Sequence, residues 1–474
     1  MKISIIRIAC YCFIILLTVT GCSGLKTSSN TTGVTPDENI SVEPTNHNER
    51  QNGVEEIIEE KLNILIKADE ELKDGITVLY QAYFNGENPV FVQTGEDLIA
   101  TTKRDGFSFH PKIEATYLWN SILLPVSDYP EVKEFIKFSI SIDGQQVLAD
   151  EGLLIFPEGI TDQAGNPFTI NQPYHRVIST YGPSTAFIYA IGAGDRLVSA
   201  SYLGARDPLG AAVMEKIDPR FPALMGDDYF SQDEFNIEQA AILEPDLIVT
   251  SARTAWLETA AQLDIPVFLY DAETIDRLKE AMLLTGQIFG PHAYAKSEAW
   301  VSYFESVMNK ISTETSDIPE DERLRVLFTG TQPLRVASGD MFQTAIIELA
   351  GGVSVSVELN GYWNDVDLEQ IAIWDPDLII VPPYGGASVE AITESPEWQI
   401  LNAVQSGRVY QMPKLVVPWD TPAPDSVLGI IWMANLYNPE LQSLDCAEEA
   451  QYFYNTFYNY QVTQEELSAI CSYE

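Results

Sequence analysis

Residues 237–249 read Ile-Glu-Gln-Ala-Ala-Ile-Leu-Glu-Pro-Asp-Leu-Ile-Val, and residues 368–380 read Leu-Glu-Gln-Ile-Ala-Ile-Trp-Asp-Pro-Asp-Leu-Ile-Ile. The second stretch repeats the first at a constant offset of 131 residues, which pairs Glu238 with Glu369 and Asp246 with Asp377. Similarity at so long a spacing indicates two copies of a domain-sized unit and not a solenoid. The alternative is that a common helix–proline–strand sequence has recurred by chance.

Both copies predict the same local structure. The Glu-Gln pair opens a short amphipathic helix, which Pro-Asp ends because proline lacks an amide proton and clashes with the preceding turn. The apolar runs 247–249 and 378–381 are typical of strands buried on both faces of a parallel sheet. Polar or aromatic segments follow them. We therefore predict an α/β protein with two Rossmann-like lobes whose strand ends face each other across a cleft.

The chain carries a formal charge of −42 at pH 7, from 69 acidic and 27 basic side chains in 474 residues. So strong a negative charge repels nucleic acid and anionic lipid surfaces, which excludes both as partners. The simplest meaning of the charge is a solvated acidic surface that keeps the protein soluble. The length indicates more than one domain.

The first 53 residues are predicted to lie outside the folded part. Lys2 and Arg7 flank the start of an apolar run, which ends at residues 19–22, Val-Thr-Gly-Cys, and resembles a bacterial lipobox. We expect residues 1–21 to be removed as a signal peptide. Cys22 would then carry the lipid that anchors the chain at the extracytoplasmic face of the cell membrane. The alternative is a plain signal peptide or membrane anchor with an incidental cysteine.

Residues 22–53 are rich in Ser, Thr, Asn, Pro and Glu, which is typical of a flexible tether. Two cysteines, Cys446 and Cys471, remain beyond the lipidated position. Their spacing matches no metal motif, and an exported location permits disulfides. We predict a structural disulfide between them that closes the helical tail.

Residues 54–160 are predicted to form a small extra N-terminal domain, α+β or β-rich, of unknown role. Residues 54–72 place apolar side chains at helical spacing. Residues 138–142 alternate apolar and polar side chains before Asp143-Gly144, which predicts a β-hairpin. The aromatic content of the segment argues against disorder.

A new pattern begins near residue 161. Residues 176–180 predict a strand, a helix follows from about Ser184, and residues 197–201 predict the next strand. Gly192 and Gly194 end that helix and do not open one, which excludes a dinucleotide-binding loop.

The segment 176–201, the two repeated stretches and residues 398–410 resemble the iron-complex and cobalamin group of ABC-transporter solute-binding proteins. The tyrosine-rich tail at 454–458 is similar to the ends of some members. The resemblance covers residues 161–470 and does not reach residues 54–160.

The resemblance implies two α/β lobes joined by one long helix, a stiff arrangement that closes little on its ligand. Residues 293–311 lack Gly and Pro and have helical spacing of apolar residues, so they are the candidate for that helix. An ordinary surface helix is the alternative. The implied domains are an N-lobe at 161–290, a connecting helix at 291–316, and a C-lobe with a helical tail at 317–474.

The resemblance also implies a function. The cleft would bind an iron complex, such as a ferric siderophore or haem, or a corrinoid, and deliver it to an ABC permease dimer and its ATPase. No cofactor is expected, because the metal complex would be cargo, and the protein is expected to be a monomer. Glu238 and Glu369 match the glutamates that pair with permease arginines in the family, and equivalent charges on two lobes suit a two-fold symmetric partner. The alternative is that both stabilise helix N-termini.

Aromatic and arginine side chains in loops at the strand ends are the candidates for ligand contact. Aromatic rings offer a rigid surface to a large, partly apolar chelate, and arginine pairs bidentately with carboxylates or oxyanions. The candidates are Tyr181, Tyr202 and Arg253 from the first lobe and Arg335, Tyr362, Trp363 and Trp419 from the second. For each aromatic residue the alternative is packing of its loop against the core.

No sequence motif of a hydrolase, metalloprotease or nucleotide-binding enzyme occurs, and the four histidines are scattered. We therefore predict no enzymatic activity and no metal site built on several imidazoles. Two other functions stay open. A molybdate- or tungstate-binding protein of the same fold would rely on Arg253 and Arg335. A cell-surface adhesin or sensor that reuses the fold would use residues 54–160.

Overall fold

The structure, a computed structural model, describes residues 64–101, 116–118, 121–153, 159–201, 208–225, 230–441 and 443–473. All of these residues belong to one compact unit that spans residues 61–474. The expected signal peptide, the lipidation site Cys22 and the tether lie outside the described residues. Within the described ranges, no helix has the length and apolar character needed to cross a membrane.

Residues 64–101, 116–118 and 121–153 form a five-stranded mixed sheet with helices, in the strand order β2-β1-β3-β5-β4. Its strands are β1 (Leu65–Ala68), β2 (Val90–Phe91), β3 (Leu98–Thr101), β4 (Thr116–Leu118) and β5 (Ser121–Pro125). Its helices are α1 (Lys73–Tyr83), α2 (Pro130–Ile140) and α3 (Ile142–Asp150), with the 3-10 turn η1 (Glu70–Leu72). Leu79, Leu123 and Phe135 lie in their shared core, which has no solvent exposure at these positions. Of the two folds predicted for this region, α+β is the one observed.

The hairpin predicted at residues 138–144 is wrong, because these residues join two helices. In α2, Val132, Phe135 and Ile136 recur at helical spacing and are buried, which outweighs five residues of alternation. Ser141 then caps α3, and its hydroxyl accepts a hydrogen bond from the Gly144 amide. A Cβ at position 144 would lie 2.1 Å from the Phe138 carbonyl oxygen. Gly144 therefore permits the close approach of two helices and does not form a turn.

The first lobe contains a parallel four-stranded sheet in the order β11-β10-β8-β9. Its strands are β8 (Val177–Ser179), β9 (Leu197–Ser199), β10 (Leu247–Ser251) and β11 (Val267–Tyr270). Its helices are α4 (Gly182–Ala190), α5 (Pro208–Ile217), α6 (Phe221–Met225), α7 (Ile237–Leu243), α8 (Leu257–Ala260) and α9 (Ile275–Phe289), with the turns η2 (Gly194–Arg196) and η3 (Ala261–Leu263). An antiparallel ribbon of β6 (Ile160–Thr161) and β7 (Pro167–Phe168) precedes the lobe. Every residue of β10 is buried, as predicted for a strand covered on both faces.

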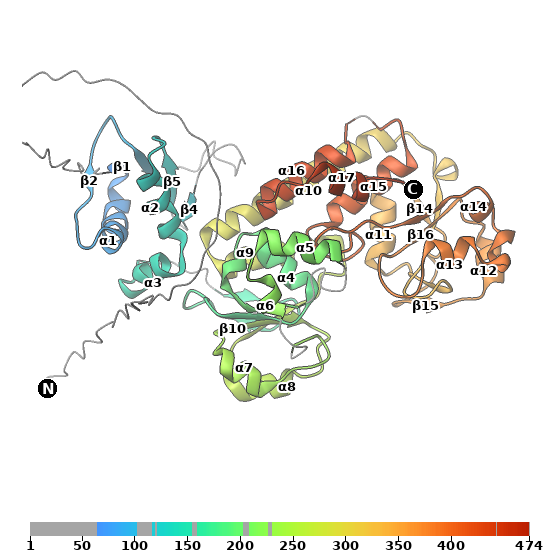
Figure 1. Cartoon of the computed structure of the whole chain (residues 1–474), viewed down its shortest axis with the longest axis horizontal. Coiled ribbons are helices and arrows are strands. Elements are labelled where there is room, and N and C mark those ends of the chain that lie inside the picture. The colour runs from blue at the N-terminus through green and yellow to red at the C-terminus, as the bar shows by residue number, and fades with distance from the viewer. Residues whose placement is uncertain are drawn as a thin grey trace, which may run out of the picture. The chain divides into compact units, whose positions relative to one another are not determined.

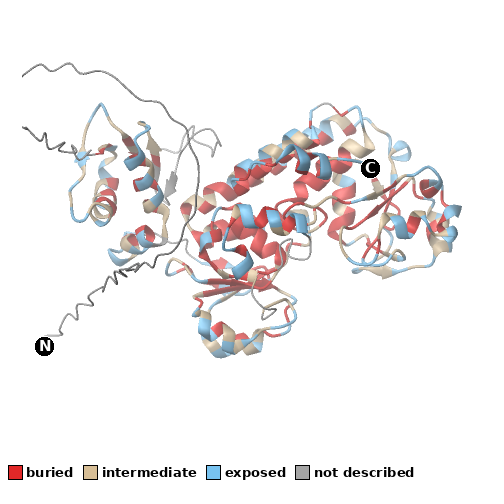
Figure 2. Ribbon diagram, viewed as in Figure 1, coloured by how far each residue is buried: buried red, intermediate tan, exposed pale blue. Residues whose placement is uncertain are grey.

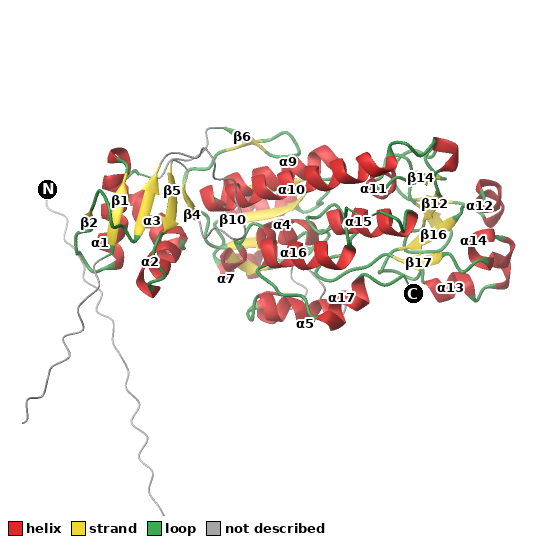
Figure 3. Cartoon of the chain, turned by 90° about the horizontal axis from the view of Figure 1, so that it is seen from above, coloured by secondary structure: helices red, strands yellow, loops and turns green. Residues whose placement is uncertain are grey.

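The second lobe repeats this plan, with a parallel sheet in the order β14-β12-β16-β17 (Figure 3). Its strands are β12 (Arg325–Phe328), β14 (Val353–Ser354), β16 (Leu378–Val381) and β17 (Val409–Gln411), with a separate antiparallel pair β13 (Arg335–Val336) and β15 (Asn364–Asp365). Its helices are α11 (Phe342–Leu349), α12 (Leu368–Trp374), α13 (Val389–Thr393), α14 (Asn402–Gln405), α15 (Ser426–Tyr437), α16 (Cys446–Tyr458) and α17 (Gln464–Ile470), with the turns η4 (Glu320–Glu322) and η5 (Pro396–Ile400). The prediction of two α/β lobes with parallel sheets is confirmed.

The two repeated stretches form one structure twice, α7 with β10 and α12 with β16, and both strands are interior in their sheets. Each helix begins at a polar cap, Asn236 or Asp367, whose side chain accepts a hydrogen bond from the third amide of the helix. Each ends at an acidic residue in the left-handed region, Glu244 with φ 45° or Asp375 with φ 43°. The proline that follows lies in the short connection between the helix and its strand.

The aspartate after each proline clamps its strand to the neighbouring one. The Asp246 carboxylate accepts hydrogen bonds from the backbone amides of His175 (2.7 Å) and Arg176 (2.9 Å), directly before β8. Asp377 likewise accepts one from the Arg325 amide (2.8 Å) at the start of β12. The Pro-Asp pair therefore ends a helix and also sets the alignment of two strands.

The helix α10 (Pro291–Thr315) links the lobes, and the helix predicted at residues 293–311 lies within it. Its apolar side chains Trp300, Phe304, Val307 and Ile311 are buried. It packs along α9 of the first lobe and also contacts α11 and α15 of the second (Figures 1 and 3). The buried residues of α10 and of both lobes form one continuous apolar core (Figure 2).

Candidate functional site

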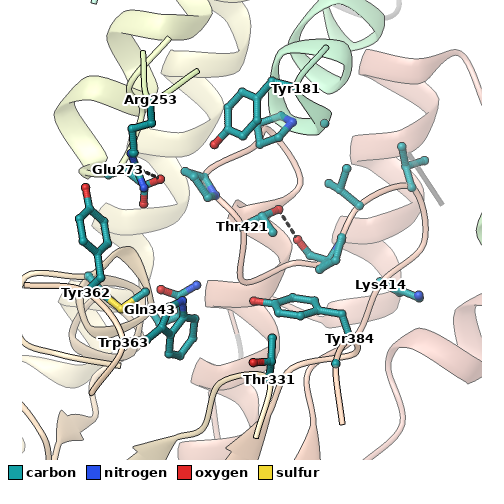
Figure 4. A pocket seen from close by; sticks show the side chains of 18 residues that line it. Tyr181, Arg253, Glu273, Thr331, Gln343, Tyr362, Trp363, Tyr384, Lys414 and Thr421 are labelled. Atoms are coloured by element: carbon teal, nitrogen blue, oxygen red, sulfur yellow. Dashed lines mark hydrogen bonds and ion pairs between the residues drawn. The ribbon is translucent and has the colours of Figure 1, made fainter. Parts of the chain in front are cut away.

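A cavity of about 670 Å³ lies between the two lobes. Its lining comes from segments that follow the C-terminal ends of the parallel strands in both sheets, which is where ligands bind in open α/β sheets. The lining residues are Tyr181, Gly182, Pro183, Arg253 and Glu273 from the first lobe and Thr331, Met341, Gln343, Tyr362, Trp363, Tyr384, Gly385, Lys414, Val416, Val417, Pro418, Thr421 and Pro422 from the second. Figure 4 shows Tyr181 and Arg253 of the first lobe on one side of the cavity and Tyr362, Trp363 and Tyr384 of the second lobe on the other.

Arg253 joins the two walls of the cavity. Its guanidinium donates a hydrogen bond to Glu273 at 2.5 Å and lies 3.7 Å from Asp271, both in the first lobe. Its Cζ also lies 4.7 Å from the centre of the Tyr362 ring, which belongs to the second lobe. A guanidinium over an aromatic face at this distance is a cation–π contact. The arginine charge is therefore already engaged by a carboxylate and a ring.

Trp363 supplies a flat wall whose position the backbone determines. A Cβ at position 330 would lie 2.8 Å from the Trp363 ring, so the indole packs directly on Gly330. Gly385, which has φ +83°, approaches Thr331 equally closely beside the same wall. Two glycines thus allow the strand-end loops to come together beneath the aromatic lining.

Two polar lining residues, Tyr384 and Gln343, contact a buried carboxyl group behind the cavity wall. The Tyr384 hydroxyl donates to Asp420 Oδ2 at 2.5 Å, and Gln343 Nε2 donates to the Asp420 carbonyl oxygen at 3.1 Å. Asp420 has no solvent exposure. Burial raises the pKa of its carboxyl group to about 6, although the hydrogen bonds from Tyr384 and Gln343 favour the charged form. Asp420 Oδ1 and Gln343 Oε1 accept no hydrogen bond in the structure.

The structure brings together four of the seven predicted ligand residues, Tyr181, Arg253, Tyr362 and Trp363. Tyr202 lies outside the described residues. Arg335 does not line the cavity; it lies in β13, whose pairing with β15 places it opposite Asp365. The prediction that Arg335 contacts the ligand is therefore not supported by its position.

The position of Trp419 likewise does not support ligand contact, because its side chain is fully buried and does not line the cavity. The indole Nε1 donates to the Tyr454 hydroxyl at 3.1 Å, and Tyr454 in turn donates to Asp425 at 2.7 Å. A Cβ at position 429 would lie 2.5 Å from the Trp419 carbonyl oxygen, so α15 packs against this residue through Gly429. The proline-rich loop thus presents Pro418, Thr421 and Pro422 to the cavity and anchors itself with Trp419.

Sequence reasoning missed several lining residues. Tyr384 carried a usable signal, because it follows the predicted strand 378–381 in the same way that Arg253 follows the first strand. Glu273, Gln343 and Lys414 carried none, since each lies in a segment that no repeat or motif marks.

The two docking candidates occupy the same position in both lobes. Glu238 and Glu369 are the second residues of α7 and α12, and both are exposed. The two C-terminal cysteines, Cys446 and Cys471, are joined as a disulfide with their Cα atoms 5.8 Å apart. In the part of the chain that the structure describes, no three His, Cys, Asp or Glu side chains gather in a group that could hold a metal ion.

Comparison with known proteins gives a consistent result. The sequence profile of a family described as periplasmic binding protein matches residues 177–415, which is just over half of the chain. A vitamin B12-binding protein of Yersinia pestis (strain Pestoides F) is 27% identical over 255 residues, which covers 52% of this chain and 78% of that relative.

Two solved structures show the same fold. One is a periplasmic solute-binding protein from Veillonella parvula DSM 2008, with a TM-score of 0.57 and 24% identity over 66% of this chain and 96% of that one. The other is the molybdate periplasmic binding protein MolA of Haemophilus influenzae with molybdate bound. It has a TM-score of 0.57 and 19% identity over 65% of this chain and 99% of that one.

Proposed function

This chain belongs to the periplasmic binding protein family, and we propose that it captures a metal complex in the interlobe cavity and delivers it to the permease of an ABC importer. The family consists of extracytoplasmic solute-binding proteins of ABC transporters, so a bound solute and a permease partner follow from membership. Its members are binding proteins and not enzymes, which confirms the prediction that the chain catalyses no reaction. The proposed cargo is a ferric siderophore, haem or a corrinoid.

The observation that carries this proposal is the size and lining of the cavity. A volume of about 670 Å³ falls within the range of about 300–1,000 Å³ that suits drug-sized ligands. It would hold about twenty water molecules at about 30 Å³ each. Tyr181, Tyr362, Trp363 and Tyr384 give it extended aromatic walls. A tetrahedral oxyanion would leave most of this space and most of these rings without a partner.

The charges of the lining favour the same class of ligand. A compact oxyanion would need a positive group to bind, and Arg253 already pairs with Glu273 and lies over Tyr362. Releasing the arginine would leave the Glu273 carboxylate without its partner beside the anion, which is electrostatically unfavourable. A large chelate can instead contact the aromatic walls with this ion pair intact.

Relatives add limited support. The curated relative at 27% identity is a vitamin B12-binding protein, so a corrinoid lies within the proposed class. The molybdate-binding structure shares the fold at 19% identity and carries no weight for the ligand. Molybdate or tungstate stays the second candidate because Arg253 and Lys414 both reach the cavity.

The proposal includes a lipid anchor at Cys22, which the lipobox-like residues 19–22 support. Such an anchor would keep the protein at the outer face of the cell membrane, close to its permease. We expect the chain to incorporate labelled palmitate in its host. Cys22→Ala should abolish that labelling and release the protein from the membrane fraction, whereas a labelled Cys22→Ala protein would contradict the anchor.

The test of the ligand uses tryptophan fluorescence of the chain without its first 22 residues. Ferric siderophores, haemin, cobalamin, molybdate and tungstate are titrated separately. We expect saturable quenching by one metal complex, which Trp363→Phe should reduce. Trp398→Phe is the matched control, because Trp398 is buried in the second lobe and does not line the cavity.

The other outcomes separate the remaining functions. If only molybdate or tungstate binds, the proposed ligand becomes an oxyanion and not a metal complex. No binding of any compound would favour the adhesin or sensor interpretation and direct attention to residues 54–160, the predicted extra domain.

A further inference from the structure

Two exposed isoleucines occupy equivalent positions in the two lobes. Ile242 in α7 is 69% exposed and Ile373 in α12 is 77% exposed, and the repeat offset of 131 residues relates them. They are the two most exposed large apolar side chains in the part of the chain that the structure describes. Scattered single apolar residues are normal on a surface. An exposed isoleucine at the equivalent position of both copies of a repeat is not a scattered single residue and requires its own explanation.

The helices hold these side chains away from the protein. Ala240 and Ile371 are the buried residues of α7 and α12, and the isoleucines follow them by two positions. At about 100° per residue, a step of two positions turns a side chain about 200° around the helix, to the side opposite the buried residue. Among the described residues, the sheet and core therefore leave most of each isoleucine side chain exposed.

Each isoleucine lies one helical turn after a glutamate. Glu238 precedes Ile242 and Glu369 precedes Ile373 by four residues, a spacing that places both side chains on one face of a helix. The caps and the left-handed ends of α7 and α12 match, so both helices meet their interior strands in the same way. The protein thus presents one Glu–Ile surface twice.

We propose that Ile242 and Ile373 each insert into an apolar pocket on one subunit of the permease dimer, beside a basic group that pairs with Glu238 or Glu369. This inference rests on the proposed function and extends its docking surface from two charges to two charge–apolar pairs. A surface repeated twice fits a partner that presents the complementary surface twice, which a dimer of identical or similar subunits does.

The two residue types would contribute differently to docking. Exposed charges mainly steer the encounter and set its orientation, and salt screens them. Burial of an apolar side chain mainly slows dissociation, because the contact forms only in the docked state. The isoleucines therefore set the lifetime of the complex, and the glutamates set its rate of formation.

The first experiment measures association and dissociation rates between the chain and its purified permease–ATPase complex in lipid nanodiscs. We expect Ile242→Ala and Ile373→Ala each to raise the dissociation rate about tenfold and together about a hundredfold, since the sites are separate. Association should change little. Glu238→Gln with Glu369→Gln should instead lower the association rate and flatten its dependence on salt.

Ile400→Ala is the matched control. Ile400 is 61% exposed and lies in η5 of the second lobe, outside the repeated stretches. Its replacement should leave both rates unchanged. Equal effects of Ile400→Ala and Ile373→Ala, or no effect of the two repeat substitutions, would overturn the inference.

The second experiment identifies the occupant by photo-crosslinking in the intact host. A benzophenone side chain is introduced at position 242, 373 or 400. We expect positions 242 and 373 to crosslink to the same permease polypeptide and position 400 not to do so. Crosslinks to a second copy of this chain, to two unrelated proteins, or to nothing would each overturn the inference.

Failure of this inference can be distinguished from failure of the proposed ligand. The tryptophan titrations are repeated on the Ile242→Ala and Ile373→Ala variants, which should bind the metal complex as the unaltered chain does. If the permease crosslinks form but none of the tested compounds binds, the proposed ligand class is contradicted and the docking surface is supported. If a metal complex binds but no permease crosslinks form, only the proposed docking surface is contradicted.

Discussion

Replacing Asp420 by asparagine should change how the stability of the protein depends on pH. The carboxyl group is fully buried behind the cavity lining, where Tyr384 donates a hydrogen bond to it. Its pKa is about 6 in the folded protein, against an ordinary value of 3.8. The folded protein therefore holds this proton more tightly than the unfolded chain does.

The size and sign follow from that difference. Between pH 4 and pH 6 the folded state binds more protons at this site, so the wild-type free energy of unfolding falls as the pH rises. The total fall is about 3 kcal/mol, at about 1.4 kcal/mol for each pH unit between the two pKa values. Asparagine keeps a similar shape and does not titrate. Asp420→Asn should therefore gain about 3 kcal/mol relative to wild type between pH 4 and pH 7.

Urea unfolding at pH 4, 5, 6 and 7, followed by tryptophan fluorescence, measures this difference. Asp425 and His292 also have pKa values shifted by burial, to about 6 and about 4 respectively. Both are present in either protein, so their effects cancel in the comparison. The exposed Asp365→Asn serves as the control. A difference between Asp420→Asn and wild type that stays constant with pH would refute the reasoning.

Three further predictions concern the cavity, the docking surface and the tail. Trp363→Ala should weaken binding of the metal complex about thirtyfold, the effect of losing about 2 kcal/mol of aromatic contact, and isothermal calorimetry showing unchanged affinity would assign the indole to packing. Glu238→Ala with Glu369→Ala should abolish uptake of the labelled complex and leave its affinity intact, so lost affinity would contradict a docking role. Removing the disulfide with Cys446→Ser and Cys471→Ser should lower the free energy of unfolding by about 3.5 kcal/mol, from the entropy of a loop with a separation of 25 residues; equal urea midpoints for the variant and the oxidised wild type would contradict this.

The lobes were predictable from the sequence because their signals are local and repeated. An apolar run after Pro-Asp marks an interior strand in each lobe, and uninterrupted helical spacing marks α10. The hairpin prediction at 138–144 failed for the opposite reason. The role of Gly144 depends on its approach to Phe138 across two helices, which the local sequence does not reveal.

The cavity was predictable where a side chain closely follows a strand or, like Tyr362 and Trp363, lies in the loop before a repeated stretch. Arg253 follows β10, and Tyr181 follows β8 after a single residue, so both could be named in advance. The contact between the lining residue Gln343 and the buried Asp420 joins segments 77 residues apart, which no periodicity encodes. Trp419 was misplaced because a loop between prolines gives no indication of which side chain turns towards the core.

The aspartate clamps divide the repeated stretches into positions that the fold requires and positions that it does not. Asp246 and Asp377 hold neighbouring strands in alignment, so nearly every substitution there should reduce the amount of folded protein whether or not the permease is present. The exposed positions 238, 242, 369 and 373 are not needed to align the strands. A variant library sorted once for the amount of folded protein and once for permease-dependent uptake would therefore separate the positions needed for folding from those needed for the partner within the two repeated stretches.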